Sequence, residues 1–164
     1  MVGTVRNAAG ALGGFTLKID SLQQVIVGGR GSFTLSEPQD GAASQCDIIV
    51  DLSRHNPMFP AYEKREGYLR ADPTHVPSLA KVVFAASQLI GTFEKPLYVR
   101  LEESLCAHNR AEQTACSNCL NVCPTGAILS AGEHVTIDPM ICAGCGSCAA
   151  VCPSGAISYD APPV

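Results

Sequence analysis

The sequence predicts an α+β protein: a β-rich N-terminal domain with one amphipathic helix near residues 76–90, followed by a cysteine-rich domain. Three observations support this prediction. Alternating or β-branched runs recur in residues 1–52, one later run has helical spacing, and a cysteine pattern repeats after 29 positions. We expect residues 1–95 to form the first, accessory domain and residues 96–164 to form the second.

The first 52 residues have the pattern of short strands separated by glycine turns. Strands are expected at residues 15–20, 22–27 and 46–52. Cys46 lies in the last of these runs, and we expect it to be a buried structural cysteine rather than a redox thiol. Residues 53–73 contain prolines and mixed charges, which predict an irregular connection with Glu63-Lys64-Arg65-Glu66 as solvated surface.

The best helix candidate lies at residues 74–90. Its apolar side follows the i, i+3, i+4, i+7 spacing and consists of Leu79, Val82, Val83, Ala86, Leu89 and Ile90. Pro77 fits only in the first turn, and Gly91 is expected to form the C-terminal cap. We expect the apolar side to pack on the N-terminal sheet, because the opposite side lacks the row of basic residues that a membrane surface requires.

Two cysteine runs carry most of the information about function: Cys116-x2-Cys119-x3-Cys123-Pro124 and Cys142-x2-Cys145-x2-Cys148-x3-Cys152-Pro153. Two-residue gaps let one tight loop present three thiolates to three corners of an iron–sulfur cube, so the fourth corner needs a ligand from elsewhere. The proline after each run fixes φ and lets the preceding cysteine point away from its own loop. Gly-Ala-Ile follows in both runs, which makes them an internal repeat.

Zinc and disulfides are the alternatives for these cysteines. Paired Cys-x2-Cys units also suit tetrahedral zinc, but three close thiolates with one remote thiolate match a cube better than two zinc knuckles. A disulfide framework requires an oxidising compartment, and the N-terminus has no pattern of a secretory signal. We therefore expect iron–sulfur clusters in a reducing cytoplasm.

Residues from about 104 to 160 resemble the bacterial ferredoxins that hold two [4Fe–4S] clusters. The resemblance implies a ferredoxin-type domain of two cluster-binding repeats related by a pseudo-twofold axis. Its ligands would form two sets. The set that we name cluster 2 is Cys142, Cys145, Cys148 and Cys123, and the set that we name cluster 1 is Cys116, Cys119, Cys152 and one further cysteine.

The sequence departs from the family pattern at Gln113, where the first run would begin with a cysteine. Cys106 is the expected replacement in cluster 1, and residues 107–115 must then loop out while both ends stay at the cluster. The alternative is a buried apolar Cys106, which leaves three thiolates for a [3Fe–4S] cluster or for a cube with another fourth ligand. His108 and Arg110 lie in this loop, where solvated side chains are expected rather than donors to the cluster.

The rest of the second domain predicts short strands. Residues 127–129 and 135–138 flank a glycine-containing loop and predict a hairpin, and residues 157–159 predict another strand. A domain of about 60 residues is marginal for a hydrophobic core alone. We therefore expect the two clusters to act as its core, and loss of iron to unfold it.

We expect the two clusters to transfer electrons. The long segment before them indicates a protein or subunit that serves a larger oxidoreductase, rather than a free carrier, and that is not catalytic by itself. Residues 104–164 hold one basic and four acidic residues, so we expect a redox partner with a basic docking surface. Aromatic residues make up 5% of the chain and tryptophan is absent, which argues against a nucleic-acid partner. No apolar run has the length of a membrane span.

Two other interpretations stay open. The clusters could be structural or sensory in a regulatory or maturation protein, or the chain could be a fragment of a multidomain redox enzyme. The longer chain also has a fainter resemblance, through Asp51-Leu52-Ser53-Arg54 and Gly67-Tyr68-Leu69-Arg70, to bacterial 4Fe–4S proteins of formate-dehydrogenase gene neighbourhoods.

Overall fold

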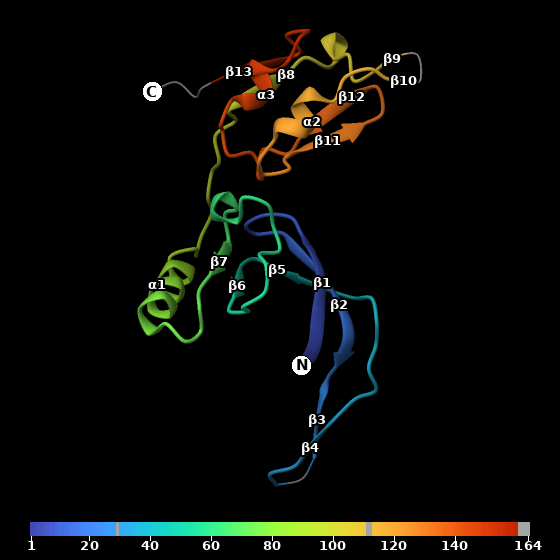
Figure 1. Cartoon of the computed structure of the whole chain (residues 1–164). Helices are drawn as coiled ribbons and strands as arrows, with labels where there is room; N and C mark the ends of the chain where they lie inside the picture. The colour runs from blue at the N-terminus through green and yellow to red at the C-terminus, as the bar shows by residue number, and fades with distance from the viewer. Residues whose placement is uncertain (29, 111–112, 161–164) are drawn as a thin grey trace. The chain divides into compact units, whose positions relative to one another are not determined.

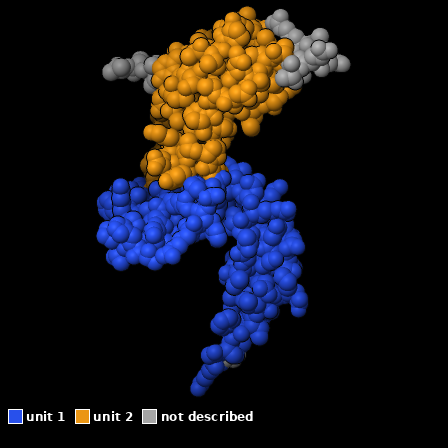
Figure 2. All heavy atoms as spheres, viewed as in Figure 1, with its two compact units in different colours: residues 1–58, 67–88 blue, residues 59–66, 89–164 orange. Residues whose placement is uncertain are grey.

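The computed structural model describes residues 1–28, 30–110 and 113–160 (Figure 1). The fold is mixed and sheet-rich with few helices, and its N-terminal region is rich in strands, as the sequence predicts. The chain divides into two compact units, which Figure 2 colours separately. Unit 1 comprises residues 1–58 and 67–88, and unit 2 comprises residues 59–66 and 89–164. Unit 2 thus includes two short segments, 59–66 and 89–95, that precede the expected boundary at residue 95.

A three-stranded antiparallel sheet makes up much of unit 1. β1 (Val2–Ala9) pairs with β2 (Phe15–Gln23), which pairs along its other edge with β5 (Ala42–Cys46). Gly10 follows β1 at φ +97°, where an added Cβ would lie 2.2 Å from the Gly14 carbonyl oxygen, so only glycine fits. Phe15 is fully buried at the start of β2. The strand predicted at residues 15–20 is confirmed.

Two more strand pairs belong to unit 1. β3 (Val25–Val27) and β4 (Phe33–Leu35) are antiparallel, whereas β6 (Ile49–Asp51) and β7 (Tyr68–Arg70) are parallel. The strands predicted at residues 22–27 and 46–52 are each divided between two elements. The prediction of an irregular connection over residues 53–73 is wrong at β7, because a parallel partner lies far away in sequence and leaves no local pattern.

Buried polar groups join β6 to β7. The Asp51 carboxylate lies 3.6 Å from Nε of Arg70 and accepts a hydrogen bond from the Tyr68 hydroxyl. Burial alone would raise the pKa of Asp51, but the hydrogen bonds from Tyr68 and Ser53 and the charge of Arg70 outweigh it and lower the pKa. Asp51 therefore stays ionised near neutral pH and links the two strands through charge-assisted hydrogen bonds.

α1 (Val76–Ser87) is the helix expected at residues 74–90. Pro77 lies in its first turn, as predicted. Nδ1 of His75 caps the N-terminus by accepting a hydrogen bond from the Ser78 N–H at 3.2 Å. The described residues contain no helix that is long and apolar enough to cross a membrane.

The C-terminal end of α1 differs from the prediction. The Gln88 N–H donates to the Ala85 carbonyl at 3.2 Å, which tightens the last turn, and the helix ends before Gly91. The predicted glycine cap is therefore wrong. Val82 is buried but Val83 and Ile90 are exposed, so only part of the predicted apolar side is buried.

Unit 2 consists of short elements. Its antiparallel pairs are β8 (Val99–Leu101) with β13 (Ile157–Tyr159), β9 (Asn109–Arg110) with β10 (Gln113–Thr114), and β11 (Ile128–Ala131) with β12 (His134–Ile137). Its helical segments are η1 (Tyr62–Lys64), η2 (Glu103–Leu105), α2 (Asn118–Val122) and α3 (Ser147–Ala150). The hairpin predicted around residues 127–138 and the strand predicted at 157–159 are confirmed.

The core of unit 2 and the cysteine runs share residues. One group of buried side chains consists of Cys119, Ile128, Val135, Cys148 and Ile157. Cys119 and Cys148 are equivalent positions of the 29-residue repeat, and so are Ile128 and Ile157. Each repeat thus supplies one cysteine from a short helix and one isoleucine from a strand to the same small core.

Candidate iron–sulfur centre

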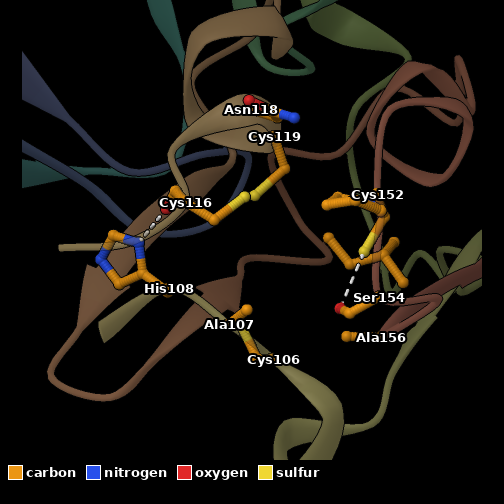
Figure 3. Close-up of a pocket in the computed structure, with 11 residues that line it drawn as sticks. Cys106, Ala107, His108, Cys116, Asn118, Cys119, Cys152, Ser154 and Ala156 are labelled. Atoms are coloured by element: carbon orange, nitrogen blue, oxygen red, sulfur yellow. Dashed lines mark hydrogen bonds between the residues drawn. The ribbon is translucent and has the colours of Figure 1, made fainter. Parts of the chain in front are cut away.

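Four cysteines line one cavity of unit 2, and they are the four expected for cluster 1 (Figure 3). They are Cys106, Cys116, Cys119 and Cys152. The sulfur atoms of Cys116 and Cys119 point toward one another, and Cys152 lies across from them. The empty space is about 310 Å³, including solvent at its open side. Three separate segments of the chain therefore converge here, and each of them contributes at least one thiol to the cavity.

Short helical segments hold these cysteines. Cys106 follows η2 and donates its N–H to the Glu103 carbonyl at 3.0 Å. Cys119 lies in α2, and Cys152 follows α3 with its N–H 3.3 Å from the Ala149 carbonyl. Burial raises the pKa of Cys119, and the nearby charges of Cys116 and Cys106 raise it further. A metal that binds the thiolates would remove this mutual repulsion.

The segment between Cys106 and Cys116 is a β-hairpin, formed by β9 and β10. His108 lies at its base and exposes 5% of its surface, so the expectation of a solvated side chain is wrong. Its Nδ1 lies 2.7 Å from the Cys116 carbonyl oxygen and its Nε2 lies 2.7 Å from the Ser130 hydroxyl. Because a carbonyl only accepts, Nδ1 is the donor there, and Nε2 forms the second hydrogen bond with the Ser130 hydroxyl. The Arg110 side chain and residues 111–112 lie outside the described residues.

Three of the four cysteines expected for cluster 2 lie close together. Cys148 is buried in α3; burial raises its pKa, and the charges of Cys142 and Cys145 raise it further. The fourth, Cys123, packs against the core group that contains Cys148. In the described part of the chain, no three His, Cys, Asp or Glu side chains converge as ligands of a single metal ion.

The two cysteines that precede prolines have matching surroundings. The Thr125 hydroxyl lies 3.7 Å from the Cys123 sulfur, and the Ser154 hydroxyl lies 3.7 Å from the Cys152 sulfur. Backbone N–H groups also donate to both sulfurs: those of Thr125, Ala127 and Ile128 to Cys123, and those of Ser154, Ala156 and Ile157 to Cys152.

These donors favour the thiolate forms of both cysteines. Burial would raise the pKa of Cys123 and of Cys152, but in each case the hydrogen bonds outweigh burial and lower the pKa. The donor groups follow the 29-residue repeat residue by residue, which explains why Gly-Ala-Ile recurs after each proline. Thiolates held by N–H donors, under strands that exclude water, fit iron–sulfur ligation.

Arg65 and Lys95 are residues of this unit that sequence reasoning missed. The solvated surface predicted for residues 63–66 is wrong at Arg65, which is buried and donates from Nη2 to the Thr125 carbonyl at 3.0 Å. The Lys95 side chain is 8% exposed, and its Nζ lies 2.8 Å from the Met140 carbonyl oxygen. Both contacts join residues far apart in sequence, so local patterns do not predict them. For Arg65, the local signal of burial is the apolar Phe59-Pro60 before the charged run.

Cys46 lies apart from these residues, in β5 of unit 1. It is half-buried, and burial followed by the charge of Asp47 raises its pKa. A raised pKa keeps the thiol protonated and unreactive at neutral pH. Cys46 is thus less buried than predicted, whereas its raised pKa agrees with a structural rather than a redox cysteine.

Comparison with known proteins identifies part of unit 2. Residues 114–156 match the family model of the 4Fe–4S dicluster domain. A search of curated proteins finds no significant match, and nothing supports the fainter resemblance to proteins of formate-dehydrogenase gene neighbourhoods. The matched residues hold seven of the nine cysteines, and Cys106 lies before them. The C-terminal part of this chain therefore contains a 4Fe–4S dicluster domain of the bacterial ferredoxin type, a domain of iron–sulfur electron transfer.

Proposed function

We propose that the protein transfers electrons through two [4Fe–4S] clusters and serves a larger oxidoreductase as a protein or subunit. The observation that carries the proposal is the cavity lined by Cys106, Cys116, Cys119 and Cys152, because one thiol set from three separate segments meets there. Cysteines that were present for apolar packing alone would not be expected to line one cavity together. The family match to a dicluster domain supports the second cluster.

The proposed ligands follow the two sets expected from the sequence. Cluster 1 takes Cys106, Cys116, Cys119 and Cys152, and cluster 2 takes Cys123, Cys142, Cys145 and Cys148. A pseudo-twofold relation between the repeats is part of the proposal. It is supported by the matching donors around Cys123 and Cys152 and by the paired core residues.

The chain's own residues bind and tune the clusters. When bound, the clusters supply the one-electron redox change. The backbone N–H groups that follow Cys123 and Cys152 stabilise negative charge on both sulfurs, and Ile128 and Ile157 keep water from the core beside them. Hydrogen bonds to sulfur and burial are two of the main determinants of cluster potential.

We propose a redox partner with a basic docking surface, in a reducing cytoplasm. Unit 2 exposes Glu102, Glu103, Glu133 and Asp160, and thiolate-bound clusters add negative charge. Complementary charge steers such partners together. A reducing compartment keeps the thiols available for iron.

An anaerobic redox titration followed by EPR, with iron and acid-labile sulfide analysis, tests the proposal on the full chain. We expect about eight iron and about eight sulfide per chain and two reversible one-electron steps, because each cube holds four of each atom. Zinc in place of iron, or cysteines oxidised to disulfides in the anaerobic protein, would contradict it. Full clusters that accept no electron within the physiological range would favour the structural or sensory role instead.

A further inference from the structure

Arg65 is a buried cation in unit 2, outside the residues that match the dicluster family. It follows η1 and exposes 8% of its surface. Its guanidinium carbon lies 4.6 Å from the centre of the Phe59 ring, and Nη2 donates to the Thr125 carbonyl at 3.0 Å. Arginine keeps its proton in proteins, so a fixed positive charge is held inside this unit.

Thr125 connects this charge to a proposed cluster ligand. Thr125 exposes 3% of its surface, and its hydroxyl lies 3.7 Å from the Cys123 sulfur. Burial lowers the pKa of Arg65, whereas the charges of Asp138 and then of Cys123 raise it, so the Asp138 carboxylate and the Cys123 sulfur both lie within electrostatic reach of the guanidinium. Water screens the interaction less than it would at the surface, because Arg65 is buried and Cys123 is half-buried.

Among the described residues, no cation is bonded at the equivalent position of the other repeat. Ser154 is the counterpart of Thr125, and its hydroxyl lies at the same distance, 3.7 Å, from the sulfur of Cys152. Ser154 is exposed, however, and no side chain in the described part of the chain donates to its carbonyl. Residues 59–66 therefore make two otherwise matching cysteine environments electrostatically different.

We propose that Arg65 raises the reduction potential of the cluster that takes Cys123 as a ligand, and so separates the potentials of the two clusters. This inference rests on the proposed function, because it requires both clusters to be bound. Reduction adds one electron from the redox partner and breaks no bond. Arg65 stabilises the more negative, reduced state, so an electron shared between the clusters favours cluster 2 more than it would without this residue.

The test replaces the charge and measures both potentials in the full chain. In Arg65→Met, an anaerobic EPR titration should show one step moved to lower potential and the other unchanged. We expect the ratio of reduced to oxidised cluster at a fixed potential to fall about tenfold, which is about 59 mV for a one-electron couple. Arg65→Lys keeps the charge and should stay closer to the native potential. Cys123→Ser identifies the moving step, because it should alter the EPR signal of that same step.

Lys64→Met is the matched control. Lys64 is the neighbouring residue, carries the same charge and is exposed, so water should screen it and neither step should move. Two unchanged steps in an iron-replete Arg65→Met protein would overturn the inference. An equal shift in Lys64→Met would also overturn it, because net charge alone would then explain the result.

Further variants keep the test decisive if Arg65→Met does not bind its full iron. Arg65→Gln keeps a hydrogen-bond donor but removes the charge. A lower reduction potential of cluster 2 in Arg65→Gln than in Arg65→Lys supports the inference, and equal potentials refute it. Loss of iron from all three variants also refutes it, because Arg65 would then act on assembly. A native protein without two reversible steps contradicts the proposed function itself, which separates the two failures.

Discussion

At the scale of single residues, Cys106 determines whether cluster 1 is complete. It lies outside the family match and is separated from Cys116 by residues 107–115, yet both cysteines line the same cavity. We predict that Cys106→Ser lowers the iron content from about eight to about seven or fewer per chain, because a cube without its fourth thiolate loses at least one iron. The measurement is iron analysis combined with EPR.

The matched control for this prediction is Cys46→Ser, which changes a half-buried cysteine of unit 1 in the same way. It should keep the full iron content and both redox steps. If Cys106→Ser also keeps them, the fourth ligand of cluster 1 is another residue, and Cys106 is an apolar cysteine of the cavity wall.

At the scale of elements, the β9–β10 hairpin lies in the segment between Cys106 and Cys116 and lets both cysteines line the same cavity. The Ala115 N–H donates to the His108 carbonyl at 2.8 Å, and the His108 ring joins the Cys116 carbonyl to the Ser130 hydroxyl. We predict that His108→Leu destabilises unit 2 by about 1–3 kcal/mol, because the two partly buried hydrogen bonds of the ring to the Cys116 carbonyl and the Ser130 hydroxyl are lost. It should also speed the release of iron to a chelator, measured by absorbance.

His134→Leu serves as the control for the hairpin. His134 lies in β12 of the same unit, and its ring lies 3.7 Å from an exposed Glu103 carboxylate, a contact of little energetic weight. Iron release from this variant should stay near the native rate. Equal acceleration in both variants would mean that any change of histidine loosens the unit, and the role assigned to His108 would fail.

At the scale of the whole molecule, the two units should respond differently to the removal of iron. The core of unit 2 is small and contains two proposed ligands, Cys119 and Cys148, whereas unit 1 has its own buried residues around Phe15 and Tyr68. We predict that chelation of iron unfolds residues 89–160 and leaves β1, β2 and β5 protected, because only unit 2 couples metal binding to folding.

Hydrogen exchange followed by mass spectrometry distinguishes these outcomes segment by segment. Protection should disappear from β11, β12 and β13 and persist in the three-stranded sheet of unit 1. Loss of protection from both units together would show that they fold as one cooperative body. Full protection of unit 2 without iron would show that its apolar core suffices.

Local patterns explain what sequence reasoning found. Cysteine spacing, the prolines and the repeat identified the dicluster segment, because ligation by one loop depends on neighbouring residues. The hairpin around Gly132 and the position of Pro77 in the first turn of α1 were predicted for the same reason. The pairing of β7 with its parallel partner was missed because it joins separate segments. The C-terminal end of α1 was also predicted wrongly, because a local 3-10-type hydrogen bond of Gln88, rather than Gly91, forms the cap.

The sequence by itself determined the chemistry of this protein, since the order and spacing of its thiols select iron–sulfur clusters over other groups. Only the tertiary structure decided which surroundings those thiols receive. It buried His108 and Arg65, two polar residues expected in solvent, and brought Arg65 to the Thr125 carbonyl across 60 residues of sequence. The physical reason is that ligand geometry is encoded within a loop, whereas burial and electrostatic environment arise from segments that meet only after folding.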